Sequence, residues 1–388
     1  MTPVLPGFDD VTDEQLRERA DLNWALAPPD VLPAWVAEMD YATCPVVDEA
    51  VGDAVRVGRF GYPSPQATDR LREATVGFAG RRLGWTVDPS LVLATGDVMA
   101  GVLLALRALC EDAPVVVPTP AYPPFLDVVP LSGRRLVPLP LDPDSARAEL
   151  DLDRIDAALK AGARTVLLCN PHNPWGRSWS AAELGGLRDV VLRHGARVLS
   201  DEIHAPLVLP GARHTPYGSL EGTAGHVTTV LSASKAFNLP GLKCAQIVAG
   251  SPADARALAA LPPVANHGTS PLGVVANTAA YERGDSWLDL ALGHLDGNRT
   301  LFAELVAEQL PLARLRRLEA TYLAWVDLRA YGLDDPAGVA LDRGRVMVRA
   351  GADFGPGGDG HVRVNLATSR SRLTELVRRL GNAFDPAG

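Results

Sequence analysis

Lysine is nearly absent from this chain of 388 residues, in which arginine carries almost all of the positive charge. Of the 37 lysine and arginine residues, only Lys160, Lys235 and Lys243 are lysines, and the last two both lie in the stretch TTVLSASKAFNLPGLK (228–243). A lysine amine, unlike an arginine guanidinium, can lose its proton and attack a carbonyl carbon to form an imine. Because a short apolar run here leads into a serine-rich loop, the sequence predicts a reactive amine at Lys235.

The sequence also lacks paired cysteines, an excess of basic residues and any long apolar run. Cys44, Cys110, Cys169 and Cys244 form no CxxC pair, so we expect reduced thiols rather than a disulfide framework. The net charge of −9 and the pI near 5.4 argue against nucleic acid or an anionic membrane as a partner. No stretch is apolar enough to span a bilayer, and the acidic N-terminus does not have the pattern of an export signal. We therefore expect a cytoplasmic protein whose partners are small molecules.

From residue 91 onward, apolar runs of strand length alternate with segments of helical period. Strands joined through helices favour an α/β fold with a mostly parallel sheet that is covered on both faces. Ligands of such sheets bind at the carboxyl ends of the strands. Helices are predicted over 44–58, 98–110, 122–129, 152–161 and 181–194, and strands in LVLAT (91–95), APVVVPT (113–119), RRLVPLPL (134–141), TVLLCN (165–170), RVLSDE (197–202) and TTVLSAS (228–234).

The two ends of the chain have a different pattern. Residues 1–45 show no clear period and are predicted to form an irregular arm that precedes a large domain over 46–285. After it, a long helix (286–309), strands in TYLAWVDLR, GRVMVRA and HVRVNLA, and a closing helix (371–384) predict a smaller α+β domain over 286–388. GPGGDG (355–360) neither follows a buried strand nor opens a helix, so it is predicted to be a hairpin connection rather than a phosphate loop.

Polar residues follow several of the predicted strands, and each group also has an ordinary structural explanation. The triplet GDV (96–98) could hold a phosphate on its backbone amides, or Asp97 could simply cap the next helix. NPHNPWG (170–176) could present Asn173 to a ligand, or could be an ordinary turn stiffened by its prolines. Neither pattern decides between these alternatives by itself.

The segment SDEIH (200–204) ends a predicted strand with two acids and a histidine. Asp201 and Glu202 would point to opposite sides of that strand, so we expect one to be buried toward a site and the other to be solvated. Strand-end acids also commonly cap the next helix, which is the plain alternative. A metal site that includes His204 is disfavoured because no second nearby histidine completes it, and no bound metal is expected.

In this order, the amide-rich turn, the asparagine, the acid and the Ser-x-Ser-Lys segment resemble the fold type I enzymes that use pyridoxal 5'-phosphate, the aminotransferase class I and II superfamily. The resemblance covers about residues 32–380, and the chain is most similar to the carbon–sulfur lyases of the cystathionine beta-lyase type. It implies a seven-stranded, mostly parallel large domain and a smaller α+β domain formed by both chain ends. The phrases that carry it are WVAEMDY, FGYPSP, PTPAYPPF, LLCNPHNPWG, SDEIHAPLV, SASKAFNLPGLK, NHGTSP, TYLAWVDLR and HVRVNLA.

The resemblance implies roles for the residues that match these phrases. Lys235 would bind the cofactor aldehyde as an imine and later take the α proton of the substrate, while Asp201 would keep the pyridine nitrogen protonated. Asn173 and His204 would lie beside the ring hydroxyl, and Tyr122 would stack on the ring. The residues that would hold the phosphate are Gly96, Asp97, Val98, Ser232, Ser234 and Lys243.

Further roles concern the substrate and a second subunit. Arg363 would bind the α-carboxylate with its forked guanidinium, and Trp175 and Asp40 would belong to the substrate site. Tyr62 in FGYPSP would reach the active site of a neighbouring subunit and act there, which implies a homodimer with shared sites. From the residues alone, Tyr122 could instead be a packed turn aromatic, and Arg363 could lie on the solvated face of a strand.

Two departures from the superfamily pattern affect the expected substrate more than the cofactor. Trp175 stands where relatives usually carry a small threonine, and Asp97 places a carboxylate beside the expected phosphate. His204 stands where many aminotransferases have a tyrosine, and with AEMDY and NHGTSP it favours β-elimination. The expected reaction converts an S-substituted L-cysteine into a thiol, pyruvate and ammonia. The alternatives are an aminotransferase, and a regulatory protein of the same fold with a secondary lyase activity.

Overall fold

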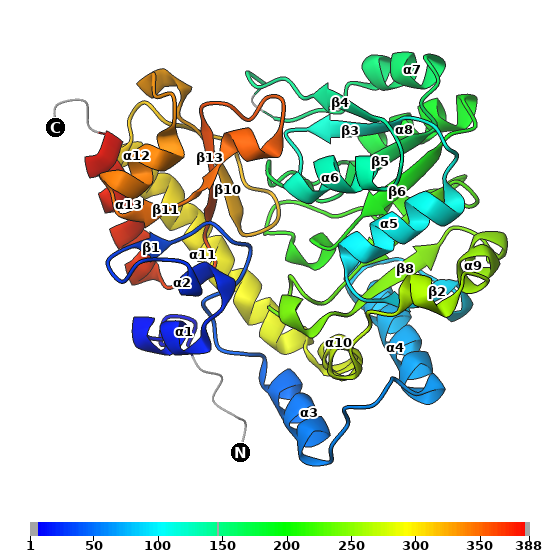
Figure 1. Cartoon of the computed structure of the whole chain (residues 1–388). Helices are drawn as coiled ribbons and strands as arrows, with labels where there is room; N and C mark the ends of the chain where they lie inside the picture. The colour runs from blue at the N-terminus through cyan, green and yellow to red at the C-terminus, as the bar shows by residue number, and fades with distance from the viewer. Residues whose placement is uncertain (1–6, 146, 385–388) are drawn as a thin grey trace.

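A computed structural model describes residues 7–145 and 147–384, which form a larger and a smaller lobe (Figure 1). The larger lobe is built on one sheet of seven strands in the order β2-β8-β7-β6-β5-β3-β4. All neighbouring strands run parallel except β8, which is antiparallel to both β2 and β7. The strands are β2 (Val92–Thr95), β3 (Val115–Thr119), β4 (Leu136–Pro140), β5 (Thr165–Cys169), β6 (Arg197–Asp201), β7 (Val227–Leu231) and β8 (Ala245–Ala249).

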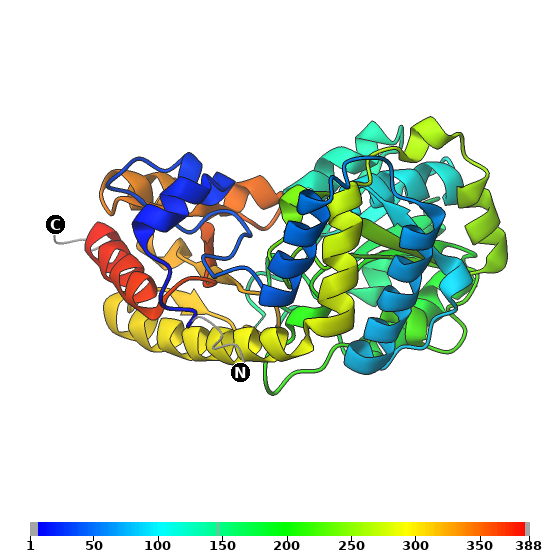
Figure 2. The same ribbon diagram turned by 90° about the horizontal axis from the view of Figure 1, so that it is seen from below.

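Helices cover this sheet, and several begin where a short polar side chain caps the first turn. Asp97 caps α5, and Ser180 and Glu183 form a reciprocal capping box at the start of α8. Helix α10 packs between α3 and α4, as Figure 2 also shows. The helices of this lobe are α3 (Pro45–Arg56), α4 (Pro65–Phe78), α5 (Val98–Leu109), α6 (Pro123–Leu131), α7 (Leu152–Lys160), α8 (Ala181–Arg193), α9 (Pro252–Ala259) and α10 (Pro271–Arg283).

The smaller lobe combines both ends of the chain. Strand β1 (Leu32–Pro33) pairs with β11 (Val346–Met347), so the N-terminal arm joins the C-terminal elements. A four-stranded sheet of order β12-β13-β10-β9 packs with the long helix α11, which runs along this lobe in Figure 2. Its other elements are α1 (Asp13–Arg19), α2 (Leu22–Ala25), α11 (Asp285–Gln309), β9 (Arg314–Leu315), β10 (Leu323–Asp327), α12 (Pro336–Asp342), β12 (Arg349–Ala350), β13 (His361–Asn365) and α13 (Arg370–Phe384).

The predicted α/β fold, with a mostly parallel sheet and a second α+β unit, is confirmed, but three details differ. Strand β8 was not expected from the sequence, and GRVMVRA forms two short strands instead of one. The expectation that one acid of SDEIH is solvated is wrong, because Glu202 is fully buried and accepts hydrogen bonds from Ser200, His214 and the Tyr217 backbone. No helix in the described part of the chain has the length and apolar character needed to cross a bilayer.

Candidate active site

The carboxyl ends of the parallel strands surround a cavity of about 340 Å³. Segments before, within and after the large sheet contribute to its wall, as expected for a ligand site of an open α/β sheet. Predicted site residues that line it are Asp97, Val98, Tyr122, Asn173, Asp201, His204, Ser234, Lys235, Lys243 and Arg363.

Lys235 lies in the turn after β7, and the loop that carries it is held by hydrogen bonds. Ser232 Oγ donates to the carbonyl of Cys244 at 2.8 Å and accepts from the Ser234 amide at 3.1 Å. The Lys235 amine donates to the carbonyl of Ala37 at 2.7 Å. Burial lowers the pKa of Lys235 to about 8. Near neutral pH a useful fraction of this amine is therefore uncharged and able to act as a nucleophile or a base.

Asp201 is the last residue of β6 and faces the same cavity. Burial raises its pKa to about 7, although the Ile203 amide donates to Asp201 Oδ1 at 3.0 Å. The charged form of a buried carboxyl is stabilised by a cation or a strong donor. The protonated ring nitrogen of a bound pyridine would provide such a cation for Asp201.

At the other end of the cavity lies the beginning of α5. Asp97 Oδ1 accepts from the Ala100 amide at 2.8 Å, so its side chain caps the helix, and Lys243 Nζ lies 2.9 Å from Asp97 Oδ2. A Cβ on Gly96 would lie 3.0 Å from the carbonyl oxygen of Gly268, so this turn passes close to the NHGTSP segment. The N-terminal end of α5 together with the lysine suits a phosphate.

Tyr122, Asn173 and His204 line the middle of the cavity. Burial lowers the pKa of His204 to about 3, so its imidazole is neutral at neutral pH. Its Nδ1 atom is buried and has no hydrogen-bond partner among the described residues. Burial raises the pKa of the Tyr122 phenol, which is therefore protonated at neutral pH. These groups can stack on a ring and donate hydrogen bonds to it.

Arg363 projects from β13 of the smaller lobe into the cavity. It donates to Asn173 Oδ1 at 3.2 Å and to the carbonyl of Trp35 at 2.8 Å, while its Nε has no partner among the described residues. Burial lowers the pKa of Arg363 to about 10, which leaves it charged at neutral pH. The solvated-face alternative does not hold, because all five residues of β13 are buried.

Five predicted site residues do not line this cavity. Gly96 and Ser232 shape the neighbouring turns, as described above. Asp40 is buried within the N-terminal arm, where Trp24 Nε1 and Thr368 Oγ1 donate to it at 2.7 and 2.6 Å. Both of its oxygens therefore take part in holding the arm, and a contact with substrate stays a prediction.

The other two are aromatic residues. Trp175 does not form the wall beside a ring in this cavity, because its indole packs in the core under α8 and beneath the guanidinium of Arg316, 4.3 Å from the ring centroid. Tyr62 is 87% exposed and contacts the ring of His267 edge to face. Its side chain is therefore available to another molecule.

The wall that the N-terminal arm contributes was not expected from the sequence. Trp35, Val36 and Ala37 line the cavity, as does Arg349. Asn238, with a positive φ of 56°, fixes this arm by accepting from the Met39 amide at 2.9 Å and donating to its carbonyl at 2.8 Å. The phrase WVAEMDY pointed to this segment, but its lack of a period did not show which residues face the site.

The donor set fits pyridoxal 5'-phosphate. The cavity provides a buried amine for the aldehyde, a buried acid for the ring nitrogen, and a lysine with a helix N-terminus for the phosphate. With the seven-stranded, mostly parallel sheet, these features define a protein of the fold type I class of pyridoxal-phosphate proteins.

Comparisons with known proteins agree with this class. The family model for aminotransferase class I and II matches residues 35–380, and the chain belongs to this family. A Mycobacterium leprae protein, provisionally named cystathionine beta-lyase, is 43% identical over 97% of this chain and 98% of its own. A Corynebacterium glutamicum protein named cystathionine beta-lyase is 38% identical over 96% of this chain and 98% of its own. The structure of the PLP-bound C-S lyase from Staphylococcus hominis has a TM-score of 0.91 and 28% identity, covering 98% of this chain and 99% of that one.

Proposed function

We propose that this chain, a carbon–sulfur lyase that uses pyridoxal 5'-phosphate, cleaves an S-substituted L-cysteine by β-elimination into a thiol, pyruvate and ammonia. The observation that carries the proposal is the Lys235 amine, whose pKa burial lowers to about 8, facing the same cavity as Asp201 and Arg363. Relatives at 38% and 43% identity are named for cleavage of cystathionine, an S-substituted cysteine, which supports the reaction type.

The bound cofactor supplies an electron-withdrawing ring that acidifies the α carbon of an amino acid. The residues of the chain provide the remaining functions. Arg363 orients the substrate through its α-carboxylate, and Lys235 is the base that takes the α proton. Loss of that proton lets the electron pair expel the thiolate from the β carbon. The thiolate then takes up a proton, and water hydrolyses the remaining enamine to pyruvate and ammonia. Asp201 stabilises positive charge at its end of the cavity, and neutral His204 does not add positive charge beside Arg363.

The cavity wall favours an apolar S-substituent. Carbon-rich side chains and charged groups share this wall: the Arg363 guanidinium lies over the Phe354 ring, 5.0 Å from its centroid. A substrate held by Arg363 would therefore place its S-substituent against nearby carbon-rich surface, which supports a bulky cysteine conjugate as well as cystathionine. Apolar residues of this lining include Leu22, Trp35, Val36, Ala37, Val98, Met99, Pro123, Pro124, Ile203, Pro240 and Phe354.

The reaction type is tested by incubating purified, cofactor-loaded protein with L-cystathionine and with S-aryl or S-alkyl cysteines in the absence of any oxo acid. Release of equal amounts of pyruvate and thiol is expected, because elimination needs no amino acceptor. Strict dependence on an added oxo acid would contradict the proposal and establish an aminotransferase. Absence of turnover with every cysteine conjugate and every amino donor would favour the regulatory alternative.

We expect Arg363→Lys to raise KM roughly 100-fold with a smaller change in kcat, because a lysine cannot form the paired hydrogen bonds of a guanidinium with a carboxylate. Arg349→Lys is the matched comparison, since Arg349 lines the same cavity but is already paired with Asp353 at 2.7 Å. Steady-state kinetics of both variants decide the assignment. A large rise in KM for the Arg349 variant alone would show that Arg349, and not Arg363, binds the α-carboxylate of the substrate.

We further propose that the chain acts as a homodimer in which Tyr62 enters the partner's active site. Apolar side chains around Tyr62 are exposed, which is unusual for a surface without a partner. Tyr62 lines no part of the cavity of its own chain. The exposed apolar residues of this region are Val55, Val57, Phe60, Tyr62 and Val264.

Mixing two inactive variants tests this shared site. Tyr62→Ala and Lys235→Ala chains, unfolded and refolded together in equal amounts, should recover about one quarter of the wild-type activity, because half of the dimers would carry one intact site. Each variant refolded alone provides the control. No recovery in mixtures that contain proven heterodimers would show that Tyr62 acts within its own chain or not at all.

A further inference from the structure

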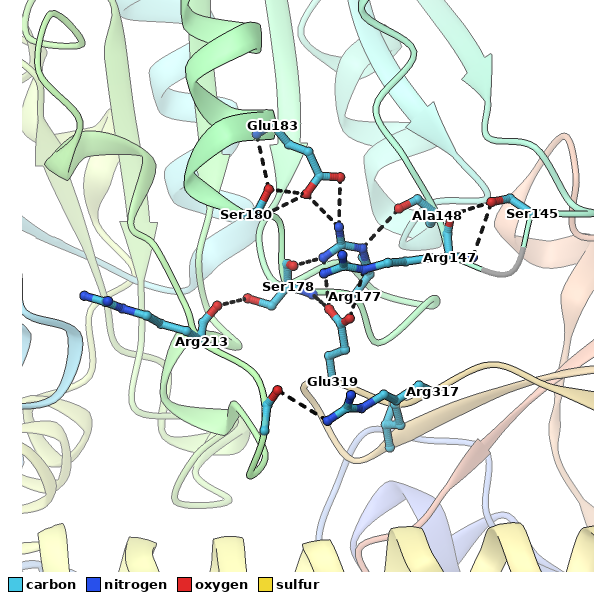
Figure 3. A network of polar contacts seen from close by, with 12 residues as sticks. Ser145, Arg147, Ala148, Arg177, Ser178, Ser180, Glu183, Arg213, Arg317 and Glu319 are labelled. Carbon is cyan, nitrogen blue, oxygen red and sulfur yellow. Dashed lines mark hydrogen bonds and ion pairs between the residues drawn. The ribbon is translucent and has the colours of Figure 1, made fainter.

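A second cavity, of about 860 Å³, lies between segments of the two lobes. Its wall combines residues 147–148, 175–181 and 211–215 of the larger lobe with residues 316–319 of the smaller one. None of the described residues lines both this cavity and the candidate active site. Figure 3 shows the polar network at this place, where Arg147 and Arg177 contact Glu319 and Arg213 extends away from it.

The charge of this wall is strongly one-sided. Arg147, Arg177, Arg213, Arg316 and Arg317 line the cavity, and the described acidic residue among its lining is Glu319. With Glu183, which pairs with Arg177 beside the cavity, five guanidinium groups face two carboxylates, an excess of three positive charges. The whole chain has a net charge of −9, so the wall of this cavity is positive although the protein as a whole is acidic.

The carboxylates of Glu183 and Glu319 already form ion pairs with some of these arginines. Arg177 is buried and donates to both oxygens of Glu183 at 2.8 and 2.6 Å and to Glu319 Oε2 at 2.9 Å. Arg147 Nε donates to Glu319 Oε1 at 3.0 Å, and the Ser178 amide donates to Glu319 Oε2 at 3.1 Å. Glu319 therefore serves to hold Arg177 and Arg147 and does not neutralise the remaining arginines.

Those remaining arginines have unused donors. Arg213 is exposed, and its side chain makes no hydrogen bond or ion pair with any described residue. Arg317 makes one long contact, 3.3 Å to the carbonyl of Gly211. Arg316 lies over the indole of Trp175 and donates to the backbone carbonyls of Ser145, at 2.9 Å, and Pro143, so its unused donor is Nη1, which is buried without a hydrogen-bond partner in the described part of the chain. A buried cationic donor without a partner is costly, and an anion would relieve that cost.

We propose that this cavity binds a small polyanion that carries at least two phosphate or carboxylate groups. Guanidinium forks match the geometry of both groups, and charge-assisted hydrogen bonds to them are strong. A volume of about 860 Å³ is within the range of small-molecule sites. Arg317 of the smaller lobe and Arg213 of the larger lobe are the main contacts. Figure 3 shows the exposed Arg213 side chain extended away from Glu319, so we expect it to turn toward the bound ligand, which then bridges the two lobes.

The site also lies next to the loop that borders the active site. Trp175 lines the second cavity, whereas Asn173, two residues earlier, lines the first. The amides of Glu319 and Ala320 both donate to the carbonyl of Gly176, at 2.9 and 3.0 Å, which ties this loop to the segment after β9 that carries Arg317. A polyanion that binds only the folded protein should therefore raise its thermal stability, with the logarithm of the ligand concentration once the site is nearly saturated.

Isothermal titration calorimetry of the cofactor-loaded protein tests the proposal, with tripolyphosphate and citrate as separate probes at fixed ionic strength. Loading with cofactor keeps the phosphate contacts of the active site occupied. At least one probe should bind once per chain, and Arg213→Gln/Arg317→Gln should weaken it by about tenfold or more. The charge-matched control Arg256→Gln/Arg343→Gln alters exposed arginines that line neither cavity and should bind like the wild type.

Which probe binds identifies the chemistry of the ligand: tripolyphosphate alone indicates a phosphate ligand, and citrate alone indicates a carboxylate ligand. Failure of both probes to bind would overturn the proposal. Equal weakening in the two double variants would also overturn it, because the effect would then reflect net charge rather than this cavity. Thermal unfolding of both variants without a probe verifies that they remain folded.

Discussion

Replacing Lys235 with alanine is expected to remove covalent cofactor attachment and to lower lyase turnover by roughly 10³-fold or more. The amine of Lys235 is the described group in the cavity best suited to bind an aldehyde, because burial lowers its pKa to about 8. It is also the base assigned to the α proton, so its loss removes two functions. The checks are loss of the visible absorption band, absence of a borohydride-stable adduct on the peptide that contains residue 235, and the rate of pyruvate release.

The scarcity of lysine supplies matched controls for this experiment. Lys160 is exposed on α7, and Lys160→Ala should bind cofactor and turn over substrate like the wild type. Lys243→Ala should keep covalent attachment but bind cofactor more weakly, because it removes a cation at the phosphate end of the cavity. Full turnover by Lys235→Ala, or a labelled peptide that lacks residue 235, would contradict the assignment of the active-site amine.

Replacing Asp201 with asparagine is expected to lower turnover by roughly 10²- to 10³-fold and to weaken cofactor binding, because the neutral amide cannot stabilise a protonated ring nitrogen. The substitution keeps the side-chain shape, and the asparagine oxygen can still accept from the Ile203 amide as Asp201 Oδ1 does at 3.0 Å. Equilibrium titration with cofactor and steady-state kinetics measure the two effects separately. Unchanged cofactor affinity in this variant would contradict the assignment of Asp201 as the residue that holds the cofactor ring nitrogen.

The same substitution should stabilise the cofactor-free protein. Burial raises the pKa of Asp201 to about 7, above the value near 3.9 of an unfolded chain, so ionisation favours the unfolded state. This cost is absent below about pH 4, grows as the pH rises from about 4 to 7, and is complete above about 7. Asp201→Asn should therefore raise the free energy of unfolding by roughly 2–4 kcal/mol at pH 8 and by less at pH 5. Chemical denaturation at both pH values provides the measurement, and a gain that is independent of pH would contradict this account.

The large sheet was predictable because strands buried on both faces appear as continuous apolar runs between helices. Strand β8 was not, because the glutamine in AQIVA interrupts its apolar run and the antiparallel direction of the strand has no sequence signal. The solvated face expected for Glu202 was wrong for a related reason. The alternation of side chains along β6 does not reveal that His214 and Tyr217 cover its far side.

Within the site, residues at strand ends were easier to predict than residues in loops. Asp201 and Lys235 follow recognisable strands, so their position at the sheet edge follows from topology. Trp175 and Asp40 lie in segments without a period, where spacing does not indicate the direction of a side chain. The cavity wall formed by Trp35, Val36 and Ala37 depends on the arm folding back over the lysine loop, a contact between distant parts of the chain.

By itself the sequence determined the kind of chemistry: an acidic chain with three lysines places one of them in a loop after a strand and follows another strand with an acid. Only the tertiary structure decided how reactive those groups are, because burial sets their pKa values and depends on residues far away in the sequence. Ala37, from the N-terminal end of the chain, contacts Lys235, and Arg363, from the C-terminal end, contacts Asn173. The arginine-lined cavity likewise arises only where the two lobes meet, since its cationic groups come from separate segments.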